Sequence, residues 1–157
     1  MSRLILLARK LEQGGAQRQL ITLAKALRDR GCDVHVVLFY AGGIFDSELT
    51  AAGVPIYFLG KHGRWDVVEF LVRLVLLLLC LQPEVIYSFL DVANILAVLV
   101  RPFIGSVRLI WSICAAGMEM HHYDWLARLV VRIEAVFSRA ADVIVANSHA
   151  GKEWGFW

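Results

Sequence analysis

Residues 3–18 read RLILLARKLEQGGAQR, a compact apolar run followed by a pair of glycines. The run from Arg3 to Ala8 has the length and composition of a buried β-strand. Apolar residues then recur at helical spacing from Ala16 to Arg30, and Gly31 is a natural stop for that helix. A strand, a glycine turn and a helix in this order predict the first unit of a parallel α/β sheet.

The same alternation continues along the rest of the chain. Because helices of about 10–15 residues separate the strands, we expect right-handed crossovers and a parallel sheet covered on both sides. Asp91 is expected to cap one of these helices, which should end near Pro102. The sequence therefore predicts an α/β fold, a doubly wound, Rossmann-like parallel sheet in a single domain of residues 1–157. Further strands are expected at residues 33–39, 55–59, 84–88, 107–113 and 142–146, and further helices at residues 45–52, 65–81, 91–101 and 124–139.

The composition indicates which classes of protein and partner fit this chain. The 157 residues are 59% hydrophobic, which favours a heavily buried sheet or a surface that something else covers. The formal net charge is only +2 and no Lys/Arg cluster stands out, so we expect no nucleic-acid partner. Cys32, Cys80 and Cys114 are far apart, which is typical of free thiols in a reducing compartment. Together with the lack of a signal-peptide pattern, this favours a cytoplasmic protein.

The segment from Val67 to Leu81 raises the question of a membrane. Glu69 and Arg73 interrupt it, and it is shorter than the roughly 20 residues of a spanning helix. Its second half is apolar on all sides, which is typical of a helix buried on most sides or of one that touches lipid or a partner. The buried helix is the favoured interpretation. Peripheral contact with the inner face of a membrane is the alternative.

Gly14 and Gly15 are the first candidates for a binding site. Glycine lets the backbone approach a ligand closely, and the helix that follows offers free N–H groups to an anion such as a diphosphate. The same pair can simply make the turn, and chemistry alone favours neither interpretation. The turn reads GGAQRQ, so the dinucleotide fingerprint GxGxxG is absent, and no GxxxxGK[ST] motif occurs. Both absences argue against a nicotinamide-dependent enzyme and a P-loop NTPase.

Four segments resemble those of family 4 glycosyltransferases, which are retaining enzymes of the two-Rossmann-domain GT-B fold. The resemblance covers nearly the whole chain. It implies that the chain is the N-terminal, acceptor-side half of such an enzyme and that the C-terminal donor-binding domain is absent from it. The segments are GGAQR at residues 14–18, LAKAL with RGCDV at residues 23–34, QPEVIYS at residues 82–88 and AADVIVANS at residues 140–148.

The resemblance also implies roles for particular residues. Gly14 and Gly15 would contact the donor diphosphate, with Arg18 as a supporting cation. Many relatives carry a basic residue just after the fifth strand, where this chain has Ile113-Cys114. No catalytic residue is therefore predicted. Candidates for the acceptor side of the cleft are Ser112, Cys114, Glu119, Asn147 and Ser148; for the two serines and Asn147, capping of a strand end is at least as good an interpretation.

Glu119, His121 and His122 form a cluster that could suggest a metal site. Adjacent histidines rarely converge on one ion and no third spaced ligand follows, so we expect no metal. A loop at residues 115–124 that lines the acceptor is the preferred hypothesis.

The function expected from the resemblance is transfer of a hexose from a nucleotide sugar to a cell-envelope or oligosaccharide acceptor. The partners would be the nucleotide sugar, as a substrate and not as a cofactor, and a glycan or lipid-linked acceptor. The alternative is a truncated, non-catalytic glycosyltransferase-like binding module that needs a separate donor-binding half.

Overall fold

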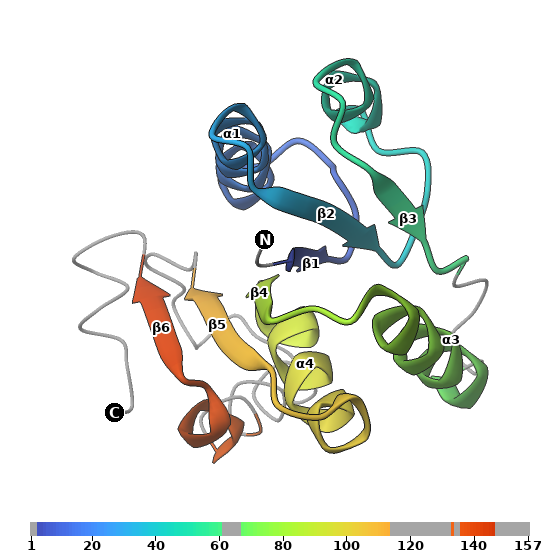
Figure 1. The fold of residues 1–157 in the computed structure, drawn as a ribbon, viewed down its shortest axis with the longest axis vertical. Helices are drawn as coiled ribbons and strands as arrows, with labels where there is room; N and C mark the ends of the chain where they lie inside the picture. Colours follow the sequence, from blue (N-terminus) through green and yellow to red (C-terminus); the bar gives the residue numbers. More distant parts are fainter. Residues whose placement is uncertain (1–2, 61–66, 114–132, 134–135, 147–157) are drawn as a thin grey trace, which may run out of the picture.

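A computed structural model describes residues 3–60, 67–113, 133 and 136–146 (Figure 1). Within these residues the chain forms a six-stranded sheet in the order β3-β2-β1-β4-β5-β6. Every pair of neighbouring strands is parallel, which confirms the predicted doubly wound α/β fold. The strands are β1 (Arg3–Ala8), β2 (Asp33–Leu38), β3 (Ile56–Phe58), β4 (Val85–Phe89), β5 (Arg108–Ile113) and β6 (Val143–Ala146).

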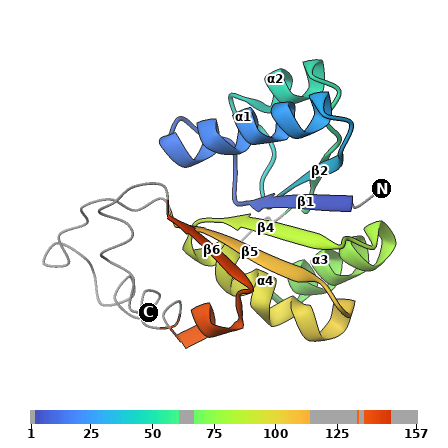
Figure 2. The same ribbon diagram turned by 60° about the vertical axis from the view of Figure 1, so that its left-hand side comes forward.

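Two layers of helices cover the sheet. Figure 2 shows α1 (Gly15–Asp29) and α2 (Asp46–Ala51) on one face, and α3 (Val67–Leu81) and α4 (Asp91–Ile104) on the other. Each layer closes a hydrophobic core of its own against the sheet. Leu6 and Ala8 of β1 belong to the core under α1 and α2, and Ile5 and Leu7 belong to the core under α3 and α4. The central strand is therefore buried on both faces, as its continuous apolar run predicts.

Helix α4 begins at Asp91, as its predicted range has it, but its capping residue and its end differ from the prediction. Leu90, and not Asp91, occupies the N-cap position, and no side chain caps the helix there. The helix also continues through Pro102 to Ile104 and ends at Gly105, where φ is +84°. Pro102 has no N–H to donate to the carbonyl four residues earlier, but α4 continues only to Ile104, so one hydrogen bond near its end is lost. The helix stops at Gly105, whose positive φ favours glycine.

The predicted helix at residues 124–139 lies almost entirely outside the described residues. Its end is described, and there Ser138–Ala140 form a 3₁₀ turn that leads into β6.

Helix α3 is buried on one side only. Phe70, Leu74 and Leu78 pack into the core, whereas Val68 is 75% exposed and Leu76 is 60% exposed. The second half of the helix was predicted to be buried on most sides, and this was wrong for the outer face, because the sheet covers a single side of the helix. Across the described ranges, the helices fall short of the length and hydropathy needed to cross a bilayer.

Asp142 fastens the edge strand β6 to the rest of the fold. Its carboxylate accepts hydrogen bonds from the Leu109 N–H at 2.7 Å and from the Arg101 guanidinium at 3.1 Å. These contacts join the start of β6 to β5 and α4. The Leu109 N–H, supported by Arg101, holds the pKa of Asp142 below its ordinary value of 3.8.

We predict that Asp142→Asn lowers the free energy of unfolding by about 1 kcal/mol near neutral pH, a value reduced for the partial exposure of the carboxylate. A lowered pKa means that the folded chain holds this proton less tightly than the unfolded chain. The stabilisation is therefore complete above the unfolded pKa and is lost as the pH falls through the lowered folded pKa. Urea unfolding at neutral and acidic pH should show a shallower acid-side loss in the variant. Asp29→Asn, at an exposed position of α1, is the control; identical pH slopes for wild type and Asp142→Asn would contradict this account.

Candidate functional site

The candidate site lies where the carboxyl ends of β1 and β4 meet. From β1 the chain builds the sheet outward through β2 to β3, and it then returns to the other side of β1 with β4. Successive connections thus leave this point on opposite faces of the sheet, as Figure 2 shows. In doubly wound sheets ligands bind in the crevice beyond the carboxyl ends of the strands at such a point.

A small pocket marks this point. Its volume is about 10 Å³, which is room for about one water molecule. The described chain therefore offers an open edge on which a ligand can lie, and not an enclosed cavity. The pocket is lined by Ala8, Arg9 and Lys10 after β1, by Ala16, Gln17 and Leu20 of α1, and by Phe89 and Leu90 after β4.

The predicted glycine turn lies beside this pocket. Gly14 is the N-cap of α1 in extended conformation, no side chain caps the helix, and its first turn has no acidic residue. The positive end of the helix dipole is therefore uncompensated by a side chain of that turn. A Cβ added to Gly15 would meet nothing within 4 Å, whereas one added to Gly14 would lie 2.5 Å from Oε1 of Gln17. Gly15 thus leaves open space at the start of the helix.

Arg18, the predicted supporting cation, makes its contacts at α2. Its guanidinium carbon lies 4.7 Å from the centre of the Phe45 ring, and Nη1 donates a hydrogen bond to Glu48 at 3.1 Å. These contacts help to hold α1 against α2. A role for Arg18 in binding a diphosphate requires the side chain to leave Glu48, and that role stays a prediction.

Two cationic residues at the pocket, Arg9 and Lys10, are not among the predicted site residues. Arg9 lies over the ring of Tyr40 at 5.6 Å, and Lys10 pairs with Glu12 at 3.3 Å. Both follow the last residue of the first predicted strand, so their position in the sequence was the signal that could have found them. They add positive charge to the same point as the start of α1.

Leu90, on the other side of the pocket, has an unusual backbone. Its φ of 71° and ψ of 161° fall in a region that is essentially restricted to glycine. Such a conformation costs on the order of 1–3 kcal/mol and is found most often at functional sites. The Leu90 carbonyl accepts the Asn94 N–H at 3.0 Å, which helps to fix this conformation at the start of α4.

A buried polar network holds α4 to the carboxyl ends of β4 and β5. Ser88 Oγ donates to Oδ1 of Asn94 at 2.7 Å, and Nδ2 of Asn94 donates to the Ser112 carbonyl at 3.5 Å. All three residues are fully buried. Ser112 therefore lies at the predicted strand end but beneath the surface, and its contact with an acceptor stays a prediction.

The loop after β2 packs tightly against the loop after β1. A Cβ on Gly43 would lie 2.7 Å from the carbonyl oxygen of Leu11 and 2.9 Å from its Cβ. The Asp46 carboxylate accepts the N–H groups of Gly42 and Gly43 at 3.1 and 2.9 Å. This packing fixes the stretch that leads from β1 into the glycine turn.

Four predicted site residues, Cys114, Glu119, Asn147 and Ser148, lie outside the described residues. In the ranges that the structure does describe, no three His, Cys, Asp or Glu side chains come together as a metal site would require.

The family model of Glycosyltransferase Family 4 matches residues 13–154. The chain belongs to this family. The match includes the glycine turn, both helix layers and the whole sheet apart from β1, so the family assignment and the predicted resemblance agree. No curated protein matches this family 4 chain.

Solved structures similar to this family 4 chain share its fold. HepE from Anabaena in complex with UDP is 22% identical with a TM-score of 0.77, and the match covers 96% of this chain and 39% of that one. For HepE with UDP and glucose the identity is also 22%, the TM-score is 0.76, and the coverage is 98% and 40%. UDP-GlcNAc 2-epimerase from Methanocaldococcus jannaschii is 14% identical with a TM-score of 0.57 and coverage of 98% and 41%. The chain thus spans about two fifths of the length of these proteins.

We predict that Gly43→Ala destabilises the fold by about 1–3 kcal/mol, because the added methyl group collides with the backbone of Leu11 and that backbone cannot move aside cheaply. Urea unfolding measures the effect. Gly15→Ala is the matched control, since its methyl group enters open space at a helix start, and it should be at least as stable as the wild type. Equal stability of Gly43→Ala and wild type would show that the two loops are not held together in this way.

Proposed function

We propose that the chain is the acceptor-side part of a nucleotide-sugar-dependent glycosyltransferase. In this proposal it takes part in transfer of a hexose to a glycan or lipid-linked acceptor of the cell envelope, or to an oligosaccharide. The observation that carries the proposal is the junction of β1, β4 and the start of α1. Gly15 leaves open space there, and no side chain caps the start of α1. Arg9 and Lys10 line the pocket beside it.

The chemistry of a nucleotide sugar suits this junction. Its diphosphate carries negative charge, which the free N–H groups and positive dipole end of α1 stabilise. Arg9 adds a positive charge beside it, and Lys10 adds a second where its side chain leaves Glu12 for the ligand. In the transfer, the bond between the sugar's anomeric carbon and the diphosphate oxygen would break while that carbon bonds to the acceptor oxygen. Because the diphosphate is the leaving group, fixed positive groups at this point would stabilise the charge that develops on it. The HepE complexes with UDP, and with UDP and glucose, support this choice of ligand by analogy of fold.

We further propose that a separate Rossmann-like domain supplies most of the donor site. The pocket at the junction holds only about 10 Å³, so a nucleotide sugar needs a second wall to be enclosed. A facing domain would provide that wall, and the similar structures are long enough to contain one. Residues 1–157 by themselves are then expected to bind a donor weakly and to transfer no sugar.

A non-catalytic binding module is the second candidate. The observation that favours it is the absence of a basic residue at Ile113-Cys114, just after β5. Sugar transfer by the chain together with a donor-binding half would decide against it.

Calorimetric titration with UDP, GDP and UDP-glucose tests the proposed diphosphate site. We expect Gly15→Val to weaken binding by about tenfold or more, because the branched side chain fills the space in front of the α1 N–H groups. Gln19→Val places the same branched residue at an exposed position one turn later in α1, and it should leave binding unchanged.

The outcomes separate clearly. Loss of binding in Gly15→Val but not in Gln19→Val supports a diphosphate at the start of α1. If the wild-type chain binds none of the three ligands, the chain has no half-site of its own and this part of the proposal is wrong. Binding that Gly15→Val leaves intact would move the ligand away from the glycine turn.

A further inference from the structure

Leu90 combines a strained backbone with a place at the candidate site. Its φ of 71° and ψ of 161° fall in a region that glycine adopts freely and other residues rarely adopt. Gln82, the other non-glycine residue with positive φ in the described part of the chain, has a φ of 48°, close to the left-handed helical region. Gln82 also lies before the start of β4, whereas Leu90 lies after its end. The less favourable conformation is therefore the one at the carboxyl ends of the strands.

Buried polar groups hold Leu90 in this conformation. Its N–H donates to the Ser112 carbonyl at 3.5 Å, and its carbonyl accepts the Asn94 N–H at 3.0 Å. The side chain of Asn94 donates to the same Ser112 carbonyl and accepts a hydrogen bond from the Ser88 hydroxyl. Because these groups act on the backbone of Leu90, they hold the strained conformation without help from its side chain.

The leucine side chain itself adds little to the fold. Leu90 is 36% exposed, and of the residues that the structure describes, those grouped into the two hydrophobic cores do not include it. Glycine would adopt the same backbone without a steric cost. The leucine thus carries a cost that its packing does not explain. A backbone outlier of this kind points to a role in function.

The pocket that Leu90 lines has two unlike sides. Arg9, Lys10 and the first turn of α1 form a positive side, whereas Leu90 and Phe89 form an apolar side after β4. The space between the two sides is only about 10 Å³, so a group bound at the start of α1 lies against Leu90. A ligand suits both sides when a charged group and an apolar surface are adjacent in it.

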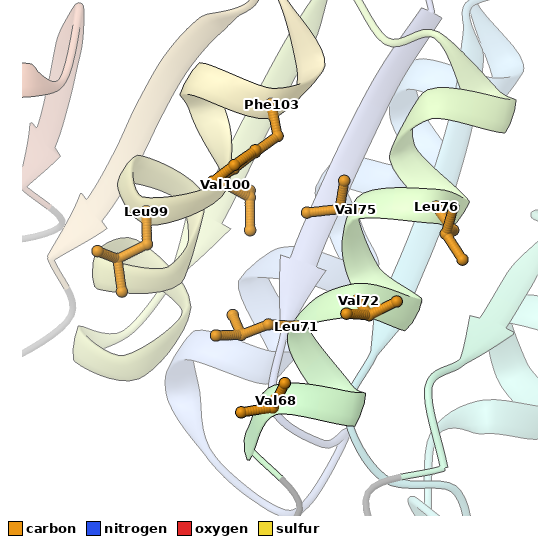
Figure 3. A pocket seen from close by; sticks show the side chains of 8 residues that line it. All are labelled: Val68, Leu71, Val72, Val75, Leu76, Leu99, Val100 and Phe103. Atoms are coloured by element: carbon orange, nitrogen blue, oxygen red, sulfur yellow. The ribbon is translucent and has the colours of Figure 1, made fainter.

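The groove between α3 and α4 has a different character. All eight side chains around it in Figure 3 are hydrocarbon, and they offer neither a charge nor a hydrogen bond to a ligand. One of them, Phe103 of α4, is 67% exposed. A sugar joined to a phosphate therefore fits the junction of β1, β4 and α1 better than it fits this groove.

We propose that Leu90 determines specificity by packing against the C–H face of the donor sugar. This rests on the proposed function, because it takes the donor diphosphate to lie at the start of α1. In a nucleotide sugar the anomeric carbon is bonded directly to the diphosphate, which places the sugar ring beside Leu90. A pyranose ring carries hydroxyl groups at its rim and C–H groups on its faces, and a leucine side chain favourably replaces water at the C–H groups.

The fixed backbone strengthens this contact. A leucine on a mobile backbone would lose conformational freedom when a sugar binds, and that loss would weaken binding. The hydrogen bonds with Asn94 and Ser112 fix the backbone of Leu90 before the ligand arrives. Leu90 therefore adds to the affinity for the sugar and leaves the affinity for the nucleotide unchanged.

The ratio of the dissociation constants for UDP and UDP-glucose tests the proposal, and NMR titration of the chain suits the weak binding expected for it. Leu90→Ala should weaken UDP-glucose binding by about fivefold, because hydrocarbon contact with the sugar is lost, and should leave UDP binding unchanged. Leu90→Gly should give the same loss although it relieves the strained backbone. Leu90→Met keeps a long apolar side chain and should restore the wild-type ratio.

Leu79→Ala is the matched control. Leu79 is 46% exposed, which is similar to Leu90, but it belongs to α3 and does not line the pocket. Its replacement should change neither dissociation constant. Circular dichroism verifies that each variant keeps the fold, and Leu90→Gly still tests the side chain if Leu90→Ala does not fold.

The outcomes separate this proposal from that of the diphosphate site. Wild-type binding of UDP, with the same ratio in Leu90→Ala and Leu90→Gly, would overturn the role of Leu90 and leave the diphosphate site in place. Equal weakening of UDP and UDP-glucose, or a loss that Leu90→Met does not restore, would show that Leu90 only supports the structure. If the wild-type chain binds neither ligand, the diphosphate site is wrong and the role of Leu90 is wrong with it.

Discussion

The pairing of β1 with both β2 and β4 is the constraint on which the rest of the structure depends. The side chains of β1 divide between two cores, with Leu6 on one face and Leu7 on the other. A slip of one residue would exchange the two sets, so the register with β2 and β4 is tightly specified. The same pairing places the end of β1 beside the end of β4 and so creates the candidate site. Because two strands and three helices lie between β1 and β4 in the chain, the site exists only once this distant pairing has closed.

Most of the fold could be predicted from the sequence, because the spacing of apolar residues distinguishes strands from helices. The exceptions depend on tertiary context. The predicted end of α4 was wrong because a proline favours a helix end at the residue before it, whereas α4 continues through Pro102 to Ile104. The prediction for the outer face of α3 was wrong because the second half of the helix is apolar on all sides and therefore does not indicate which side the sheet will cover.

The candidate site was predictable only where residue type alone limits the backbone. Gly14 and Gly15 were singled out because the helix that begins directly after them offers free N–H groups to an anion. Gly43 also belongs to a glycine pair between a strand and a helix, but the pair alone does not show what it contacts, and Leu90 carries no sequence signal at all. The importance of Gly43 comes from its contact with Leu11, a residue far from it in the sequence. A leucine at position 90 does not indicate that the residue adopts a backbone conformation normally restricted to glycine. Packing, and not composition, makes both positions special.

The outward-facing hydrocarbon of α3 and α4 also governs how the purified chain behaves in water. Copies of a protein stay dispersed when electrostatic repulsion exceeds short-range attraction, and a net charge of +2 supplies little repulsion. The exposed valines and leucines of α3 supply attraction at contact distance. Colloidal stability is therefore low where no detergent or lipid shields this face. Charged replacements at Val68 or Leu76 would improve solubility because they would interrupt this exposed apolar surface.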